Sequence, residues 1–186
     1  MEMDEVMKAK FREDKATQAA ALFIKLNGES IDQIKLMKLL YFAEREALIR
    51  WRRPIVFDSY VSMKKGPVLS QTLDLIHGDD ESDGIWNNFI SPPKNYELSL
   101  INDPGTGKLS QAEESLINEI FKTYGAIDKW ELCNLSHRLP EWQNPNGSAI
   151  PIDYKDILRG AGRTEIEIEA IIDEIENIAL MDNCMG

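Results

Sequence analysis

The stretch SIDQIKLMKLLYFAEREALIRW, residues 30–51, decides the fold that we predict for this chain. Its apolar residues recur at helical spacing and cover an arc of roughly 200°, well over the ~100° stripe of an ordinary surface helix. We therefore expect one long helix that is packed from two sides. Ser30 and Gln33 predict a capping box at its start. Arg50 near its end, followed by Pro54, indicates where the helix stops.

Further helices are predicted from capping residues and from apolar periodicity. Ser110 with Glu113 predicts a capping box, and the pairs at 128 and 131 and at 164 and 167 give the same signal. The last helix should bury a stripe of isoleucines that begins at Ile168. We expect about seven helices around the central one, the clearest of them at residues 14–27, 67–76, 110–124, 128–138, 153–159 and from 164 onward.

Two segments predict strands. Residues 55–63, IVFDSYVSM, are rich in β-branched and aromatic residues, and residues 95–101 alternate apolar and polar side chains. We expect them to form a small antiparallel sheet, in which the second strand pairs with the first. Gly66 is read as a turn residue, and Pro67 suits the first position of the following helix.

The predicted fold class is therefore α+β and mainly α-helical, a single domain built around a long central helix. Residues 1–13 are interpreted as an N-terminal arm and residues 14–186 as the domain. The glycine-rich connection at 103–108 is the best candidate for a boundary between halves.

Composition bounds the function classes. The chain of 186 residues is 43% hydrophobic and carries a net charge of −11, which disfavours non-specific nucleic-acid binding. No run is long and apolar enough for a membrane span, and the first residues lack the apolar core of a secretory signal, so we expect a cytoplasmic protein without membrane contact. The two cysteines have no metal-ligand spacing.

Two short motifs resemble ligand loops and fail in detail. GTGK at 105–108 lacks the first glycine and the Ser or Thr of a phosphate loop. The acidic segment that starts at Asp79 resembles a calcium loop, but Ile90 stands where a bidentate Glu is needed. We therefore expect no cofactor and no metal.

Four motifs carry a resemblance to a known family. KLMKLLYFA at 35–43 and GPV at 66–68 are followed late in the chain by LSH at 135–137 and PEW at 140–142. Together they resemble the signature of the Panacea domain, also called the SocA-like antitoxin domain, which includes phage-associated GepA-like proteins. The resemblance covers roughly residues 15–160.

The resemblance implies a function. Members of this family act as antitoxins of type II toxin-antitoxin systems, and neutralise a cognate toxin by direct protein-protein binding. The implied partner is a toxin encoded by an adjacent gene, and the implied protein is not an enzyme. Some SocA-like members instead act as adaptors that deliver the toxin to a protease, and this variant stays open.

A partner surface is expected on the central helix. Lys35, Lys38 and Arg45 fall within about 80° on its open side, with Phe42 among them. A solvated basic face is the plainer interpretation, and the acidic last helix could itself cover this patch; a docking surface for an acidic partner is the alternative. The expected partner-binding residues are Lys35, Lys38, Tyr41, Phe42, Arg45, Lys64 and Lys65.

A second group of motif residues is assigned a structural role. Glu44 points into the apolar arc of the central helix, so it must either find internal partners or line a cavity or interface. A lone His137 says little about chemistry. The expected structural motif residues are Glu44, Gly66, Pro67, His137 and Trp142.

Two rival functions remain. An enzyme of unknown chemistry could use Glu44, His137 or Tyr41 in a cleft. A nucleic-acid-binding regulator could use the basic stretch at 35–65, although the acidity of the chain makes nucleic acid an unlikely partner.

Overall fold

The computed structural model describes residues 9–78 and 84–185. Most of the predicted N-terminal arm lies outside these residues, and so do the first positions of the calcium-like loop, Asp79, Glu81 and Asp83. In chain order the elements are α1 (Glu13–Leu26), β1 (Ser30–Asp32), α2 (Gln33–Trp51), β2 (Tyr60–Met63), β3 (Gly66–Leu69), α3 (Ser70–His77), α4 (Trp86–Phe89), β4 (Glu97–Ser99), α5 (Gln111–Tyr124), α6 (Lys129–His137), β5 (Ile150–Ile152), α7 (Tyr154–Gly160) and α8 (Glu165–Met185).

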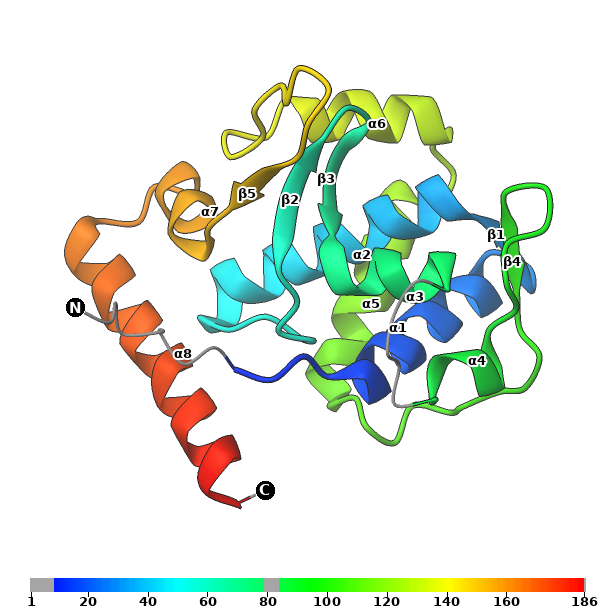
Figure 1. Ribbon diagram of the computed structural model, residues 1–186, viewed down its shortest axis with the longest axis horizontal. Helices are drawn as coiled ribbons and strands as arrows, with labels where there is room; N and C mark the ends of the chain where they lie inside the picture. Colours follow the sequence, from blue (N-terminus) through cyan, green and yellow to red (C-terminus); the bar gives the residue numbers. More distant parts are fainter. Residues whose placement is uncertain (1–8, 79–83, 186) are drawn as a thin grey trace.

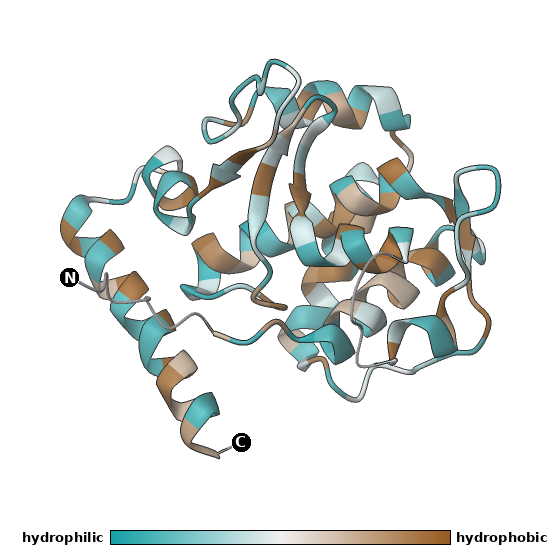
Figure 2. Ribbon diagram, viewed as in Figure 1, coloured by the Kyte–Doolittle hydropathy of each residue, from teal (hydrophilic) through white to brown (hydrophobic). Residues whose placement is uncertain are grey.

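The predicted fold class is confirmed, since the protein is α+β and mainly helical with small antiparallel sheets. Helix α2 lies in the middle, where α1, α5, α6, α7 and β3 all contact it (Figure 1). Apolar residues gather along α1, α2 and α5 in the centre of the molecule (Figure 2). The prediction that this helix is packed from more than one side is therefore confirmed, and its wide apolar arc is buried against these neighbours.

The start of α2 differs from the prediction. Asp32 is its N-cap, and Asp32 Oδ1 accepts hydrogen bonds from the backbone N–H groups of Ile34 and Lys35. Ser30 cannot cap the helix, because it is extended in β1 and pairs with Ser99 of β4. The capping boxes predicted at Ser110 and at 164 are confirmed.

The strand predictions need three corrections. Only the last four residues of 55–63 form a strand, β2, and it pairs with β3 on one side and β5 on the other. The strand predicted at 95–101 is shorter, β4, and pairs with β1 rather than with β2. Strand β5 is not among the predicted strands.

Gly66 and Pro67 lie in β3 rather than at the start of a helix. Helix α3 begins three residues after Pro67, and Asp58, which precedes β2, caps it. The carboxylate of Asp58 accepts hydrogen bonds from the N–H groups of Gln71 and Thr72 and from the Thr72 hydroxyl, at 2.7 to 2.9 Å. This buried acid thus supplies the cap that the residue before the helix, Leu69, lacks.

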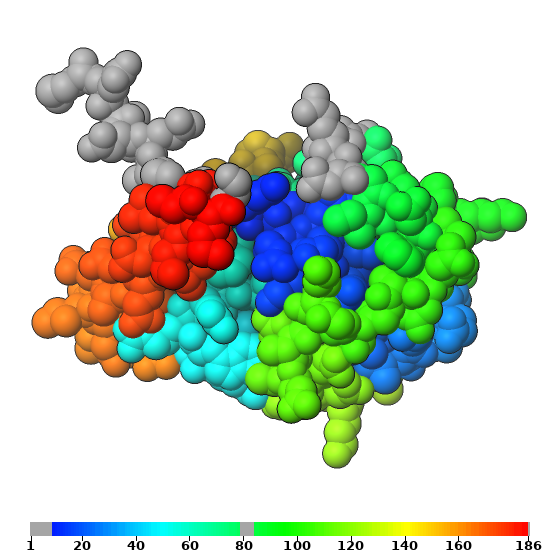
Figure 3. Space-filling view, turned by 90° about the horizontal axis from the view of Figure 1, so that it is seen from below, coloured from blue at the N-terminus to red at the C-terminus, as the bar shows by residue number. Residues whose placement is uncertain are grey.

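Helix α8 lies along one side of the molecule, beside the first described residues of the chain and the end of α2 (Figure 3). The predicted isoleucine stripe is confirmed in its main positions, since Ile168, Ile171 and Ile175 are buried in the core. Arg52 at the end of α2 forms a salt bridge with Glu174. No helix among the described residues combines the length and the apolar character of a membrane-spanning segment.

Candidate partner-binding site

The carboxylate of Glu44 is buried and has three donors around it. Its Oε1 accepts hydrogen bonds of 2.9 Å from the backbone N–H groups of Ile55 and Val56, and its Oε2 accepts one of 2.8 Å from the Tyr60 hydroxyl. Burial away from water raises the pKa of Glu44 to about 8, although the three hydrogen bonds act in the opposite direction. Glu44 therefore holds the segment between α2 and β2 in place, and its oxygens face protein groups rather than a cleft.

The ammonium group of Lys38 is also inside the molecule, so the expectation that Lys38 lies on the open side of α2 is wrong. Helix α6 and strand β3 cover that side, and Lys38 Nζ donates a 2.7 Å hydrogen bond to the carbonyl of Pro67. Burial lowers the pKa of Lys38 to about 8. Gly66 makes room for this contact, because a Cβ there would lie 2.8 Å from Lys38 Nζ and would overlap the Oγ of Ser136.

Tyr41 and Arg45 share one buried carboxylate, that of Glu141. The Tyr41 hydroxyl donates to Glu141 Oε1 at 2.9 Å, and Arg45 donates to both oxygens, at 2.7 and 3.3 Å. The side chain of Glu141 is fully buried, whereas that of Arg45 is 14% exposed. Burial beside this carboxylate raises the pKa of Tyr41 far above its ordinary value. The network therefore ties the middle of α2 to the segment after α6.

His137 and Trp142 hold the turn between β2 and β3. Their rings stack with centroids 4.1 Å apart. Trp142 Nε1 donates to the carbonyl of Met63 at 3.0 Å, and His137 Nε2 lies 3.1 Å from the carbonyl oxygen of Lys64. Lys64 and Lys65 are exposed at this turn. The two late motif residues thus fix the backbone that carries this lysine pair.

Lys65 contributes to an exposed aromatic contact on α6. Its Nζ lies 5.5 Å from the ring centroid of Trp130, and Lys129 Nζ lies 5.2 Å from the same centroid. The Trp130 side chain is still 51% exposed. Amphipathic aromatic residues of this kind are enriched in protein interfaces.

A groove opens between α2, α5 and α6. Its volume is about 230 Å³. Its floor is apolar and includes Phe42, whose ring lies 4.7 Å from that of Tyr124. Its charged lining residues are Arg45, Glu46 and Arg138. The residues that line it are Phe42, Arg45, Glu46, Ile120, Tyr124, Leu135, Arg138 and Leu139.

The structure separates the residues that the sequence grouped together. Phe42 and Arg45 reach the groove, Lys64 and Lys65 lie at the β2–β3 turn, and Lys35 is half-buried in the first turn of α2. Lys38 and Tyr41 are buried and bonded within the chain. A partner surface that includes Phe42, Arg45 and the lysine turn stays a prediction; one that includes Lys38 or Tyr41 as exposed contacts does not fit this structure.

Sequence reasoning missed the residues that complete the groove. Tyr124, Leu135, Arg138 and Leu139 come from α5 and from the end of α6, far along the chain from Phe42. Glu141 lies inside the PEW motif, next to Trp142, and its place in that motif was the one signal that the sequence offered for it. Within the described ranges there is no group of three or more His, Cys, Asp or Glu side chains that could hold a metal ion.

Comparison with protein families places this chain. The family described as antitoxin SocA-like, Panacea domain, matches residues 36–143, which is more than half of the chain. The chain belongs to this family, and the resemblance seen in its motifs is confirmed. No curated protein and no solved structure gave a significant match.

Proposed function

We propose that this protein is the antitoxin of a type II toxin-antitoxin pair and neutralises its toxin by direct binding. The observation that carries the proposal is the family, whose members are described as antitoxin-like and whose match spans α2 to the PEW motif. Every residue that lines the groove lies inside the matched span. The proposed contact surface is this groove together with the lysine turn and Trp130 of α6.

The arrangement of the polar groups supports binding over catalysis. The three groups that a rival enzyme would use do not converge, because Glu44 faces the segment before β2, Tyr41 faces Glu141, and His137 stacks on Trp142. A general acid or base must come within hydrogen-bond reach of a substrate. Glu44 and Tyr41 are instead buried and bonded to groups of the chain itself.

The size of the groove supports a protein partner. Pockets for small molecules measure about 300–1,000 Å³ and enclose most of their ligand. The groove is smaller, at about 230 Å³, and suits one or two side chains of a partner whose surface covers the surrounding helices. Interfaces of this type combine a buried apolar centre with a polar rim.

The test is co-expression with the product of the adjacent gene. We expect that the neighbouring protein stops growth when induced alone, that this chain restores growth, and that the two proteins co-purify at a fixed ratio. The adaptor variant predicts that rescue requires a cellular protease and that the toxin becomes short-lived, whereas direct neutralisation predicts rescue in protease-deficient cells with a stable toxin. A harmless neighbour that never associates with this chain would contradict the proposal.

A further inference from the structure

We infer that the groove between α2, α5 and α6 binds an apolar side chain of the toxin together with a carboxylate next to it, and that Arg138 pairs with this carboxylate. The inference rests on the proposed function and adds the chemistry of the segment that is recognised. The walls of the groove, the pairing of the charged residues that line it and the net charge of the chain support it.

The walls select an apolar side chain. Phe42 and Ile120 form a floor that is 6% and 4% exposed, and Tyr124 and Leu139 are half-buried beside it. Covering the exposed parts of such a surface is favourable by about 25 cal/mol for each Å² of apolar area. A polar side chain placed here would lose its water without gaining hydrogen-bond partners, which is costly.

The charged side chains that line the groove are paired with one exception. Arg45 is bound by Glu141, and Glu46 is bound by Arg50. Arg138 has no salt bridge or side-chain hydrogen bond with any residue in the described ranges, and it is exposed at the end of α6. A guanidinium group at the edge of an apolar site is suited to a carboxylate, which it can bind through two parallel hydrogen bonds.

The same chemistry occurs on the exposed part of α8, where Ile166 lies between Glu165 and Glu167 and where Leu180 and Met181 precede Asp182. A second copy could therefore compete for the groove. Each copy carries a net charge of −11, so two copies repel each other. We therefore assign the groove to the toxin and treat self-association as an outcome of the test.

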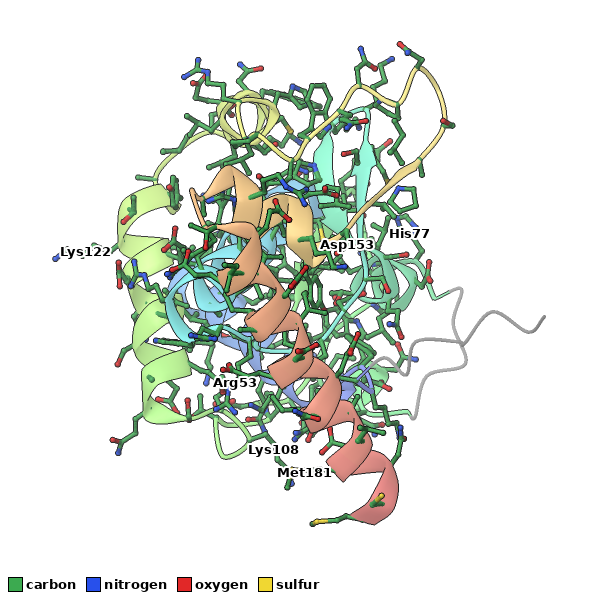
Figure 4. All side chains as sticks on the ribbon, turned by 90° about the vertical axis from the view of Figure 1, so that its left-hand side faces the viewer. Arg53, His77, Lys108, Lys122, Asp153 and Met181 are labelled. Carbon is green, nitrogen blue, oxygen red and sulfur yellow. The ribbon has the colours of Figure 1, made fainter. Side chains whose placement is uncertain are left out.

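The first experiment measures binding of the neighbouring gene product to the intact chain and to two charge-reversal variants. Arg138→Glu should weaken the complex at least tenfold by isothermal titration calorimetry. Lys122→Glu is the matched control, because Lys122 is an exposed cation of α5 that points away from the body of the molecule (Figure 4) and does not line the groove. It should change the Kd less than twofold. Thermal melts of the two variants should fall by a similar small amount, since neither side chain has an ion-pair partner among the described residues and both lie at the C-terminal end of a helix.

The second experiment uses defined probes and does not depend on the toxin. Blocked dipeptides, acetyl-Leu-Glu-amide and acetyl-Leu-Lys-amide, are titrated to millimolar concentration into the ¹⁵N-labelled chain. We expect the Leu-Glu peptide alone to shift the amide signals of Phe42, Tyr124 and Leu139, and the shifts to vanish in Arg138→Glu.

The outcomes separate the two proposals. If the toxin binds the parent and Arg138→Glu equally well, or if both dipeptides act alike, the inference about the groove is overturned while the proposed function stands. If the neighbouring protein does not bind the parent at all, the proposed function fails and the toxin is excluded as the occupant. If Arg138→Glu instead abolishes a concentration-dependent dimer in analytical ultracentrifugation, the occupant is a second copy and the toxin assignment is wrong.

Discussion

A single buried carboxylate, that of Glu44, decides how the chain leaves its central helix. Ile55 and Val56 follow α2 in a stretch rich in β-branched residues, yet they do not form a strand there. Their N–H groups donate to Glu44 and are therefore not available to a neighbouring strand. The strand predicted from residue 55 onward begins at Tyr60, whose hydroxyl closes the same network.

Replacing Glu44 by Leu should lower the free energy of unfolding by several kcal/mol. The substitution leaves two buried backbone N–H groups and the Tyr60 hydroxyl without an acceptor, and each such group costs about 1–3 kcal/mol. Glu44→Gln, which keeps an acceptor oxygen, should lose less. Urea unfolding followed by circular dichroism measures both variants. If Glu44→Leu were as stable as the parent, the internal hydrogen bonds would not be the reason for this acid, and a role in an interface would become the better explanation.

Gly66→Ala should destabilise the fold far more than Gly78→Ala. Both glycines have positive φ angles, of 107° and 73°, so both variants carry the backbone cost of about 1 kcal/mol. Only at residue 66 would the new Cβ collide with Ser136 Oγ and crowd Lys38 Nζ, whereas nothing lies within 4 Å at residue 78. Thermal melts of the two variants give the comparison. Equal losses would show that the space between β3 and α6 is not tight.

At the scale of elements, the features that depend on nearby residues were predictable. The periodicity of α2 and the capping box of Ser110 with Glu113 could be recognised because their parts lie within one or a few turns of helix. The pairing of β1 with β4 could not, because Ser30 and Ser99 meet only once the intervening helices have packed. Ser30 was therefore assigned a local role as a cap, while its backbone was needed in a strand.

The same distinction applies to the candidate site. Phe42 was found from its position on α2, but the other walls of its groove come from α5 and α6. Lys38 was expected on an open face of α2, because the sequence did not indicate that β3 and α6 would cover that face. Glu141 pairs with Arg45 across 96 positions, a separation at which no pattern of neighbouring residues carries information.

Within α8, two isoleucines should respond very differently to truncation. Ile171 is 1% exposed in the core and Ile166 is 82% exposed. Ile171→Ala should cost about 2–5 kcal/mol of unfolding free energy, because it removes buried methyl groups and leaves a cavity. Ile166→Ala should cost less than about 0.5 kcal/mol. Chemical denaturation measures the unfolding free energy of both variants. A small effect at Ile171 would mean that α8 is not held against the body of the protein.

At the scale of the whole molecule, stability should depend on pH through two buried groups of opposite charge. The pKa of Glu44 is raised from 4.5 to about 8 in the folded protein, so the folded state holds a proton that the unfolded state has lost. Its contribution is fully present below pH 4.5 and is lost as the pH rises toward 8. The pKa of Lys38 is lowered from 10.5 to about 8. The unfolded state then holds the extra proton, and stability gains as the pH rises from 8 to 10.5.

We therefore expect two variants to change different limbs of the stability curve. Glu44→Gln should remove part of the fall between pH 4.5 and 8, and Lys38→Met should remove part of the rise between pH 8 and 10.5. The measurement is the unfolding free energy of each variant relative to the parent, taken in urea at one-unit steps of pH. Differences that stay constant across each window would show that neither group changes its proton affinity on folding.

The order of the three-stranded sheet, with β2 between β3 and β5, limits how this molecule can associate. Both outer strands contain a proline, Pro67 in β3 and Pro151 in β5. Proline offers no amide hydrogen to an incoming strand, and the Pro67 carbonyl is already occupied by Lys38. The two prolines thus disfavour the addition of a further strand to either edge of this sheet, which is the kind of pairing that leads to fibrils or domain-swapped chains. Copies of this acidic protein should therefore not associate through the edges of this sheet, even in concentrated solution.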